Sequence, residues 1–150
     1  MSERKLLCEI VSPEEVVYSG EVSMVVAPAA DGEIGFLPLH TPLVTTLDIG
    51  ILRVKSSQNR WEYIAVHGGY LEVREDRVTV LADSAELASR IDVAQASEAK
   101  ERAETRIEES RGKREDFYEA EKALRWALAR LRAARGVETT ADRRPPTAAM

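Results

Sequence analysis

The sequence predicts a protein of the β plus α class, in which an antiparallel β-sandwich or flattened barrel is followed by an antiparallel hairpin of two helices. Six of the eight glycines lie at or before Gly69, and apolar and polar residues alternate in short runs through this first part. From about Ile91 the apolar spacing becomes helical, and no proline occurs until Pro145. We therefore expect a sandwich domain at 1–90, a hairpin domain at 91–136 and a disordered tail at 137–150.

The strands are expected in β-branched and aromatic runs that are bounded by turn residues. These runs are 7–11, 21–26, 51–55, 61–66, 70–74 and 77–81. The turn signals between them are Tyr18-Ser19-Gly20, Asp31-Gly32, Ser57-Gln58-Asn59 and Glu75-Asp76. No helix-length segment separates the runs, so the strands are expected to close over one core.

Residues 32–42, G-E-I-G-F-L-P-L-H-T-P, combine two glycines and two prolines and predict a rigid turn. Within it, His40 is either satisfied by the neighbouring backbone or presented at the surface together with Glu33. The pair Gly68-Gly69 predicts a tight turn or a close approach between strands. The aromatic residues Trp61, Tyr63 and Tyr70 and the single cysteine, Cys8, are expected in the core.

The first predicted helix begins at Asp92, an N-cap residue that forms a capping box with Gln95. Along it, small residues make a stripe that lets another backbone approach closely: Ala96, Ala99, Ala103 and Ile107. The chain then turns at Gly112 and stops near Gly136. The apolar face expected on the second helix consists of Phe117, Ala120, Leu124, Ala127, Leu128 and Leu131.

A two-helix hairpin of this size lies near the lower limit at which a chain buries enough surface to fold alone, so its apolar stripes are expected to dock on something. It can pack its alanine stripe against the sandwich, or lay its leucine face in a groove of another protein. After Glu121 the second helix carries only cations among its charged residues: Lys122, Arg125, Arg130, Arg132 and Arg135. These cations either complement the helix dipole or dock on an acidic partner surface.

Charge and hydropathy limit the kinds of partner that the sequence predicts. The net charge of −5 argues against nucleic-acid binding, and it is uneven: residues 1–90 hold 14 acidic and 8 basic residues, whereas 91–150 hold 12 and 13. No apolar run reaches the length of a membrane span, and the N-terminus lacks a signal-peptide core. The chain is therefore expected in the cytoplasm unless a partner brings it to a membrane.

Motifs for chemistry are missing from the sequence. There is no Walker phosphate loop, and His67-Gly68-Gly69 lacks the G-x-S-x-G elbow that a hydrolase of that type requires. His40 and His67 have no second ligand at helical spacing and no C-x-x-C beside them. We expect no catalytic residue, no metal and no cofactor.

Four segments, in this order, resemble the epsilon subunit of the bacterial F-type (rotary) ATP synthase over about residues 5–135: the loop G-E-I-G-F-L-P-L-H-T-P-L, the strands H-G-G-Y-L-E-V and V-T-V-L-A-D, and the helix end A-L-R-W-A-L-A-R-L-R. The resemblance implies the same sandwich and hairpin. It also implies a non-catalytic subunit of the central rotor, bound to the gamma subunit and the proteolipid ring, which couples proton transport to ATP synthesis.

By this resemblance Glu33 and His40 face the proteolipid ring. The hairpin of bacterial and chloroplast members can rise toward the alpha and beta catalytic subunits and block ATP hydrolysis. The candidate inhibitory contacts are then Arg125, Arg130, Arg132 and Arg135. The lack of an N-terminal transit segment favours a bacterial chain, peripheral at the cytoplasmic side of the plasma (inner) membrane, over the mitochondrial counterpart; a plastid-encoded chain would lack one too.

Some members bind ATP through a motif I-D-x-x-R-A at the start of the hairpin. Its matching residues here are Ile91, Asp92 and Ala96, but Gln95 replaces the arginine, so we expect weak ATP binding or none. Whether Arg90 compensates in part for the lost charge stays open. Two other functions stay open at this point: a free-standing nucleotide sensor, which tight ATP binding would indicate, and a small esterase, which ester turnover would indicate.

Overall fold

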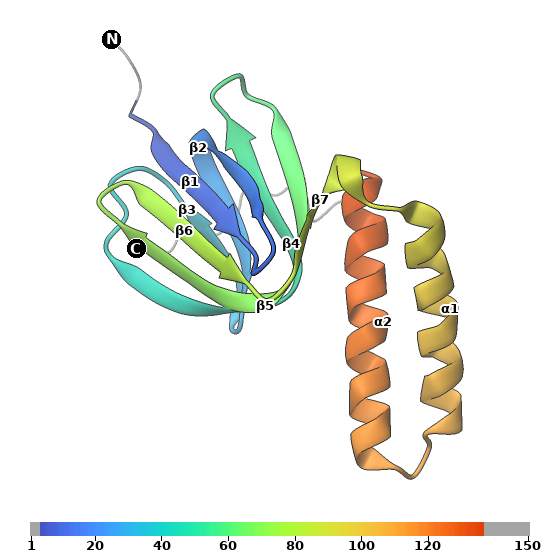
Figure 1. Ribbon diagram of the computed structural model, residues 1–150. Coiled ribbons are helices and arrows are strands. Elements are labelled where there is room, and N and C mark those ends of the chain that lie inside the picture. Colours follow the sequence, from blue (N-terminus) through green and yellow to red (C-terminus); the bar gives the residue numbers. More distant parts are fainter. Residues whose placement is uncertain (1–3, 137–150) are drawn as a thin grey trace.

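Seven strands form the first part of the computed structural model, which describes residues 4–136 (Figure 1). They are β1 (Leu6–Val11), β2 (Val16–Ala29), β3 (Gly32–Phe36), β4 (Leu43–Ser56), β5 (Trp61–Arg74), β6 (Arg77–Ala82) and β7 (Ala85–Leu87). A short 3-10 helix, Ala88–Arg90, leads to α1 (Val93–Glu109) and α2 (Arg114–Ala134). The predicted tail at 137–150 lies outside the described residues.

The first strand closes the sheet. The hydrogen-bonded order is β1-β6-β5-β4-β2-β3, and β1 pairs in addition with β2, so the strands form a closed, flattened barrel. This confirms the predicted fold class. One pairing departs from the antiparallel expectation: β1 runs parallel to β6, with Leu7 beside Arg77, whereas β1 and β2 are antiparallel.

Three strands are longer than the sequence predicted. The runs expected as separate strands at 61–66 and 70–74 are one strand, β5, which passes through Gly68 and Gly69. The turn expected at Tyr18-Ser19-Gly20 is wrong, because Gly20 lies inside β2, opposite Cys8. A continuous strand that bends can serve both layers of the sandwich, and β5 pairs with β7 at its start and with β6 at its end.

The core lies inside this barrel, on the alternating inward positions of the strands. Its largest fully buried side chains include Phe36, Leu6, Ile10, Leu52, Ile64 and Leu71. Cys8 is buried among them as expected, and burial raises the pKa of its thiol to about 12, with Glu9 as a smaller cause. The expectation for the aromatic residues is wrong in part, because Tyr70 is exposed and Trp61 is only half-buried.

The hairpin follows the predicted pattern with two changes, at Gln95 and at Phe117. Asp92 caps α1 by accepting the backbone N–H of Gln95 at 3.0 Å. The Gln95 side chain does not complete the capping box. Its Oε1 accepts a hydrogen bond from Arg130 instead. Four alanines are buried where the helices pack: Ala96, Ala103, Ala120 and Ala127. Phe117, expected on this buried face, is exposed.

Helix α2, and not the alanine stripe of α1, packs against the sandwich; it runs alongside β4 and β5 while α1 lies on its far side (Figure 1). A second, small apolar cluster forms the seam, with Ala65 of β5, Ile91 and Ala133 buried at its centre. Trp126 extends it, and its ring meets His67 edge-on at 5.2 Å. Of the two hosts that the sequence left open for the hairpin, the structure shows the sandwich. Within residues 4–136, no helix is both long and apolar enough to cross a membrane.

Gly69 marks a close approach between β5 and β6. Its φ is 121°, and a Cβ there would lie 2.1 Å from the carbonyl oxygen of Leu81. We predict that Gly69→Ala destabilises the sandwich by roughly 2–4 kcal/mol, because backbone strain and a clash with backbone add up. Urea denaturation followed by far-UV circular dichroism measures this.

Gly32 provides the matched control, because it has the same φ of 121° and a Cβ there would meet no atom within 4 Å. Gly32→Ala therefore carries the backbone strain alone, about 1–2 kcal/mol. Equal losses for the two variants would show that the approach to β6 is not what requires glycine at position 69.

Candidate functional site

The loop that the sequence singled out lies at the end of the sandwich away from the helices, between β3 and β4 (Figure 1). Its first five residues are the edge strand β3, paired with β2, so only 37–42 is a turn. The backbone turns at Leu39, a non-glycine residue with φ of 70°, and His40 N–H donates to the Leu37 carbonyl at 3.2 Å. Both leucines are exposed.

His40 is turned toward the protein. Its Nδ1 lies 2.6 Å from the carbonyl oxygen of Thr41, so this nitrogen carries the proton and donates. The ring packs edge-on against Phe36 with 4.9 Å between centroids. Its Nε2 is buried and has no hydrogen-bond partner within residues 4–136. Of the two roles considered for His40, the contacts fit the structural one: the imidazole fixes the turn to the core.

Glu33 stands on β3 as the partner of a buried arginine. Arg53 of β4 is 4% exposed, and its Nη2 donates to Glu33 Oε1 at 2.9 Å. The Arg53 guanidinium also lies 5.5 Å from the centre of the Trp61 ring, within cation–π range. About half of the Glu33 side chain stays exposed. Glu33 therefore presents a carboxylate to solvent while one of its oxygens is held in place.

Asp76, in the connection between β5 and β6, holds the turn at 37–42 in place. Its Oδ1 accepts the backbone N–H of Leu39 at 2.7 Å, and its Oδ2 accepts from Arg4. The Leu39 hydrogen bond, and next the Arg4 hydrogen bond, lower the pKa of this carboxyl. Asp76 itself has φ of 58°. Two strained backbones thus support each other across the end of the barrel.

The four arginines proposed as inhibitory contacts have different surroundings. Arg132 and Arg135 are exposed. Arg125 is half-exposed, and its Nη2 lies 2.8 Å from Asp48 of β4. Partial burial raises the pKa of Asp48, but hydrogen bonds from the Ile49 N–H and from Arg125 outweigh it, so the pKa is lowered overall.

Arg130 is the exception, because it is buried at 7% exposure. Its Nε lies 3.1 Å from Glu86 of β7, and its Nη2 donates to Gln95 of α1 at 3.0 Å. One guanidinium thereby joins β7, α1 and α2. The predicted contact with another protein is not available at Arg130 while the hairpin is docked as in this structure.

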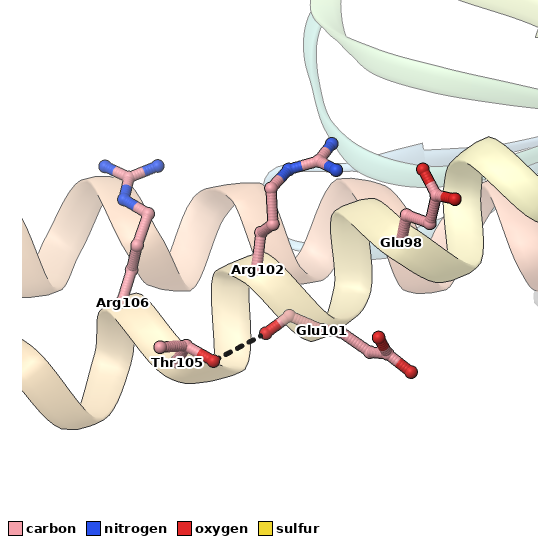
Figure 2. Close-up of a pocket in the computed structure, with 5 residues that line it drawn as sticks. All are labelled: Glu98, Glu101, Arg102, Thr105 and Arg106. Carbon is pink, nitrogen blue, oxygen red and sulfur yellow. Dashed lines mark hydrogen bonds between the residues drawn. The ribbon is translucent and has the colours of Figure 1, made fainter.

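The residues matched to the ATP motif all have structural roles in the fold. Ile91 belongs to the apolar seam, Asp92 caps α1 and Ala96 is fully buried. Further along α1 there is a shallow, open hollow, where Arg102 and Arg106 extend in the same direction as Glu98 (Figure 2). Thr105, also on its rim, donates to the backbone carbonyl of Glu101 at 3.1 Å. A hollow this open on one helix does not enclose a ligand.

No group of three or more His, Cys, Asp or Glu side chains within residues 4–136 is arranged to hold a metal ion. His40 and His67 lie on different elements with different ring partners, Phe36 and Trp126. The features described above are a braced loop at one end of the sandwich and a docked helix, α2, at the other.

Comparison with known families agrees with this arrangement. The profile of the ATP synthase delta/epsilon chain beta-sandwich domain matches residues 5–88, and that of the delta/epsilon chain long alpha-helix domain matches residues 89–135. The chain belongs to the ATP synthase delta/epsilon chain family. Together the two matches cover both structural parts, and the boundary between them falls in the 3-10 helix before α1.

Relatives place the chain among the epsilon type. The ATP synthase epsilon chain of Desulforamulus reducens is 51% identical over 126 residues, 84% of this chain and 94% of the relative. That of Halalkalibacterium halodurans is 47% identical over 122 residues, 81% and 91% of the two chains. Among solved structures, a chain of the Euglena gracilis mitochondrial ATP synthase (OSCP/F1/c-ring) has the same fold, with a TM-score of 0.74, 22% identity, and coverage of 87% and 81%.

Sequence reasoning missed the residues that brace these surfaces. Arg53 and Glu86 are single charges in strands, and Asp76 lies in the charged turn run Arg74-Glu75-Asp76-Arg77; nothing in their spacing indicates a partner that lies far along the chain. One signal was present: Arg53 follows two apolar residues of a strand whose neighbours are buried, and a charge in such a run requires a counter-ion.

The Asp76 clamp leads to a pH prediction. Because the folded state favours the ionised carboxyl, its pKa lies below the ordinary 3.9 or so, and the clamp contributes stability above about pH 4 that is lost as pH falls through the folded pKa. We expect the Leu39 amide resonance to move in a titration with a midpoint below 3.9, measured by NMR between pH 2 and 7.

In Asp76→Ala the same resonance should lose this titration and its amide should exchange faster. Glu72→Ala, which removes an exposed carboxylate from β5, is the control and should leave the titration in place. A Leu39 midpoint at or above the ordinary aspartate value in the native chain would contradict the clamp.

Proposed function

We propose that this chain is a non-catalytic rotor subunit of an F-type proton-translocating ATP synthase, which binds the gamma subunit and the proteolipid ring and helps couple proton transport to ATP synthesis. The observation that carries the proposal is the match of both structural parts to the delta/epsilon family. The place of work would be the cytoplasmic side of a bacterial plasma (inner) membrane, where the chain is peripheral through the complex.

An exposed apolar row on the sandwich supports a protein partner, which we propose is gamma. Leu81 of β6 and Tyr70 of β5 are direct cross-strand neighbours and are each more than half exposed. Val11 of β1 pairs with Leu81 on the other side, and Val44 of β4 lies diagonally to Tyr70 on the same face. Large apolar side chains that line up over four strands are typical of a surface that another protein covers.

The braced loop is the proposed contact with the proteolipid ring. Glu33 presents a held carboxylate, and Leu37 and Leu39 project from a turn that His40 and Asp76 fix. A rigid loop loses little conformational entropy on binding, which suits a contact that must transmit torque. In this proposal Glu33 touches the ring, and His40 acts by shaping the loop.

The hairpin is the proposed regulatory arm that inhibits ATP hydrolysis at the alpha and beta subunits. Its second helix carries Arg125, Arg130, Arg132 and Arg135, and it rests on the sandwich through a small cluster centred on Ala65, Ile91 and Ala133. Because this cluster is small, we expect the hairpin to separate from the sandwich at a modest cost in free energy. The main core, in contrast, contains no residue of either helix, so the sandwich is able to fold without the hairpin.

Truncation after Arg90 tests both halves of the proposal. The tagged chain 1–90 should co-purify with gamma, the catalytic subunits and the proteolipid ring from gently solubilised membranes, as the full chain should. ATP hydrolysis by the purified complex should rise about fivefold or more, the lower range of ordinary coupling between sites.

The full-length chain purified in parallel is the control for assembly and for basal hydrolysis. Unchanged hydrolysis in a complete complex would remove the inhibitory role and leave the rotor role. Recovery of the full chain alone, under conditions that keep the synthase intact, would contradict the rotor role itself.

Nucleotide sensing is predicted to be weak or absent. Gln95 stands where the ATP motif has arginine, and its side chain is already bonded to Arg130. Calorimetric titration of the isolated chain with MgATP should therefore show no saturation below about 1 mM. Gln95→Arg is the informative variant, because it restores the motif's charge; a tight site in the native chain would favour the nucleotide-sensor alternative.

A further inference from the structure

Arg130 is the most deeply buried charge at the seam between the hairpin and the sandwich. Its side chain is 9% exposed, and its partner Glu86 is 29% exposed, so the pair is largely removed from water. The second ion pair across the seam, Arg125 with Asp48, has both side chains nearly half exposed and is therefore screened. The Arg130 pair is the one whose loss changes the energy of docking most.

The chemistry of arginine makes the loss of this pair costly while the helix is docked. A buried carboxyl or lysine that loses its partner can change its protonation, but a guanidinium does not give up its proton in proteins. A buried Arg130 without Glu86 keeps only its bond to Gln95, and departure of α2 from the sandwich returns the whole guanidinium to water. The apolar seam that opposes this departure has only three buried residues at its centre, Ala65, Ile91 and Ala133.

The same guanidinium also holds the hairpin closed. Its Nη2 bonds Gln95 of α1, while its Nε faces Glu86 of β7. The Gln95 bond lies within the hairpin and survives if both helices leave together. The Glu86 bond does not survive any departure. Arg130 thus distinguishes a hairpin that moves as a unit from one that opens.

We propose that Glu86 and Arg130 form the latch that keeps the hairpin docked, with the carboxylate of the sandwich standing in for an acidic surface of the partner. Arg130, when docked, is neutralised internally and withheld from that partner. Release of α2 exposes Arg130 and frees Arg125 at the same time. This last step rests on the proposed inhibitory function; the latch itself does not.

The latch is tested first on the isolated full-length chain. Trp126 lies in the seam against His67, so in a Trp61→Phe background its fluorescence reports whether α2 is docked. Glu86→Gln keeps the shape of the side chain and removes its charge, and we expect it to raise the undocked population about tenfold or more. Hydrogen exchange of the α2 amides should accelerate in the same variant.

Two further variants separate the electrostatic cause from simple loss of structure. Asp76→Asn alters a sandwich carboxylate that is paired with an arginine far from the hairpin, and it should leave Trp126 unchanged. Arg130→Met removes the buried cation, so the double variant Glu86→Gln with Arg130→Met should dock again. Undocking in the double variant equal to that of Glu86→Gln alone, or no undocking in Glu86→Gln, would overturn the latch.

ATP hydrolysis by the assembled synthase then tests the step that rests on the proposed function. Glu86→Gln should inhibit more strongly than the native chain, and Arg130→Met should inhibit less. If the fluorescence experiment behaves as expected while hydrolysis is the same in all variants, the latch stands and the inhibitory role is overturned.

Discussion

Closure of the sheet by β1 is the constraint on which the rest of the structure depends. This short strand, Leu6–Val11, is hydrogen-bonded along both edges, antiparallel to β2 and parallel to β6. It brings the first residues of the chain beside a strand that follows much later in the sequence, and it leaves neither of its edges free. The closed barrel provides a dry core for Cys8, Ile10 and their neighbours, and it fixes both ends of the sandwich, so that each end can carry a different surface.

The loop end and the hairpin end of the sandwich are stabilised by different kinds of interaction. At the loop end, strained residues are held by several short contacts at once: Asp76 binds Leu39, and the His40 ring packs on Phe36. At the hairpin end, a few small apolar residues and one buried ion pair join α2 to the sandwich. Since removal of one partner of a buried ion pair leaves an uncompensated charge, this pair has a direct part in deciding whether the helix stays.

This contrast fits a family whose members act as parts of a larger complex. Among residues 4–136, the loop end presents a held carboxylate and two exposed leucines, and the hairpin end presents the docked helix α2. A fixed loop suits a permanent contact, and a latched helix suits a contact that is made only in one state. Gln95 illustrates how these features share residues: it was expected to complete a capping box, and it serves the latch through Arg130 instead.

The sequence by itself determined the two-part architecture, because a change from period-two to helical spacing near Ile91 and the position of the glycines are local signals. It also determined the N-cap at Asp92, the burial of Cys8 and a turn within 32–42, although 32–36 is the strand β3. Only the tertiary structure decided that β5 runs through Gly68 and Gly69, that β1 is parallel to β6, and that His40 faces inward while Arg130 is buried. These are consequences of which distant segments meet, and a charge carries no local mark of the partner that the fold will bring to it.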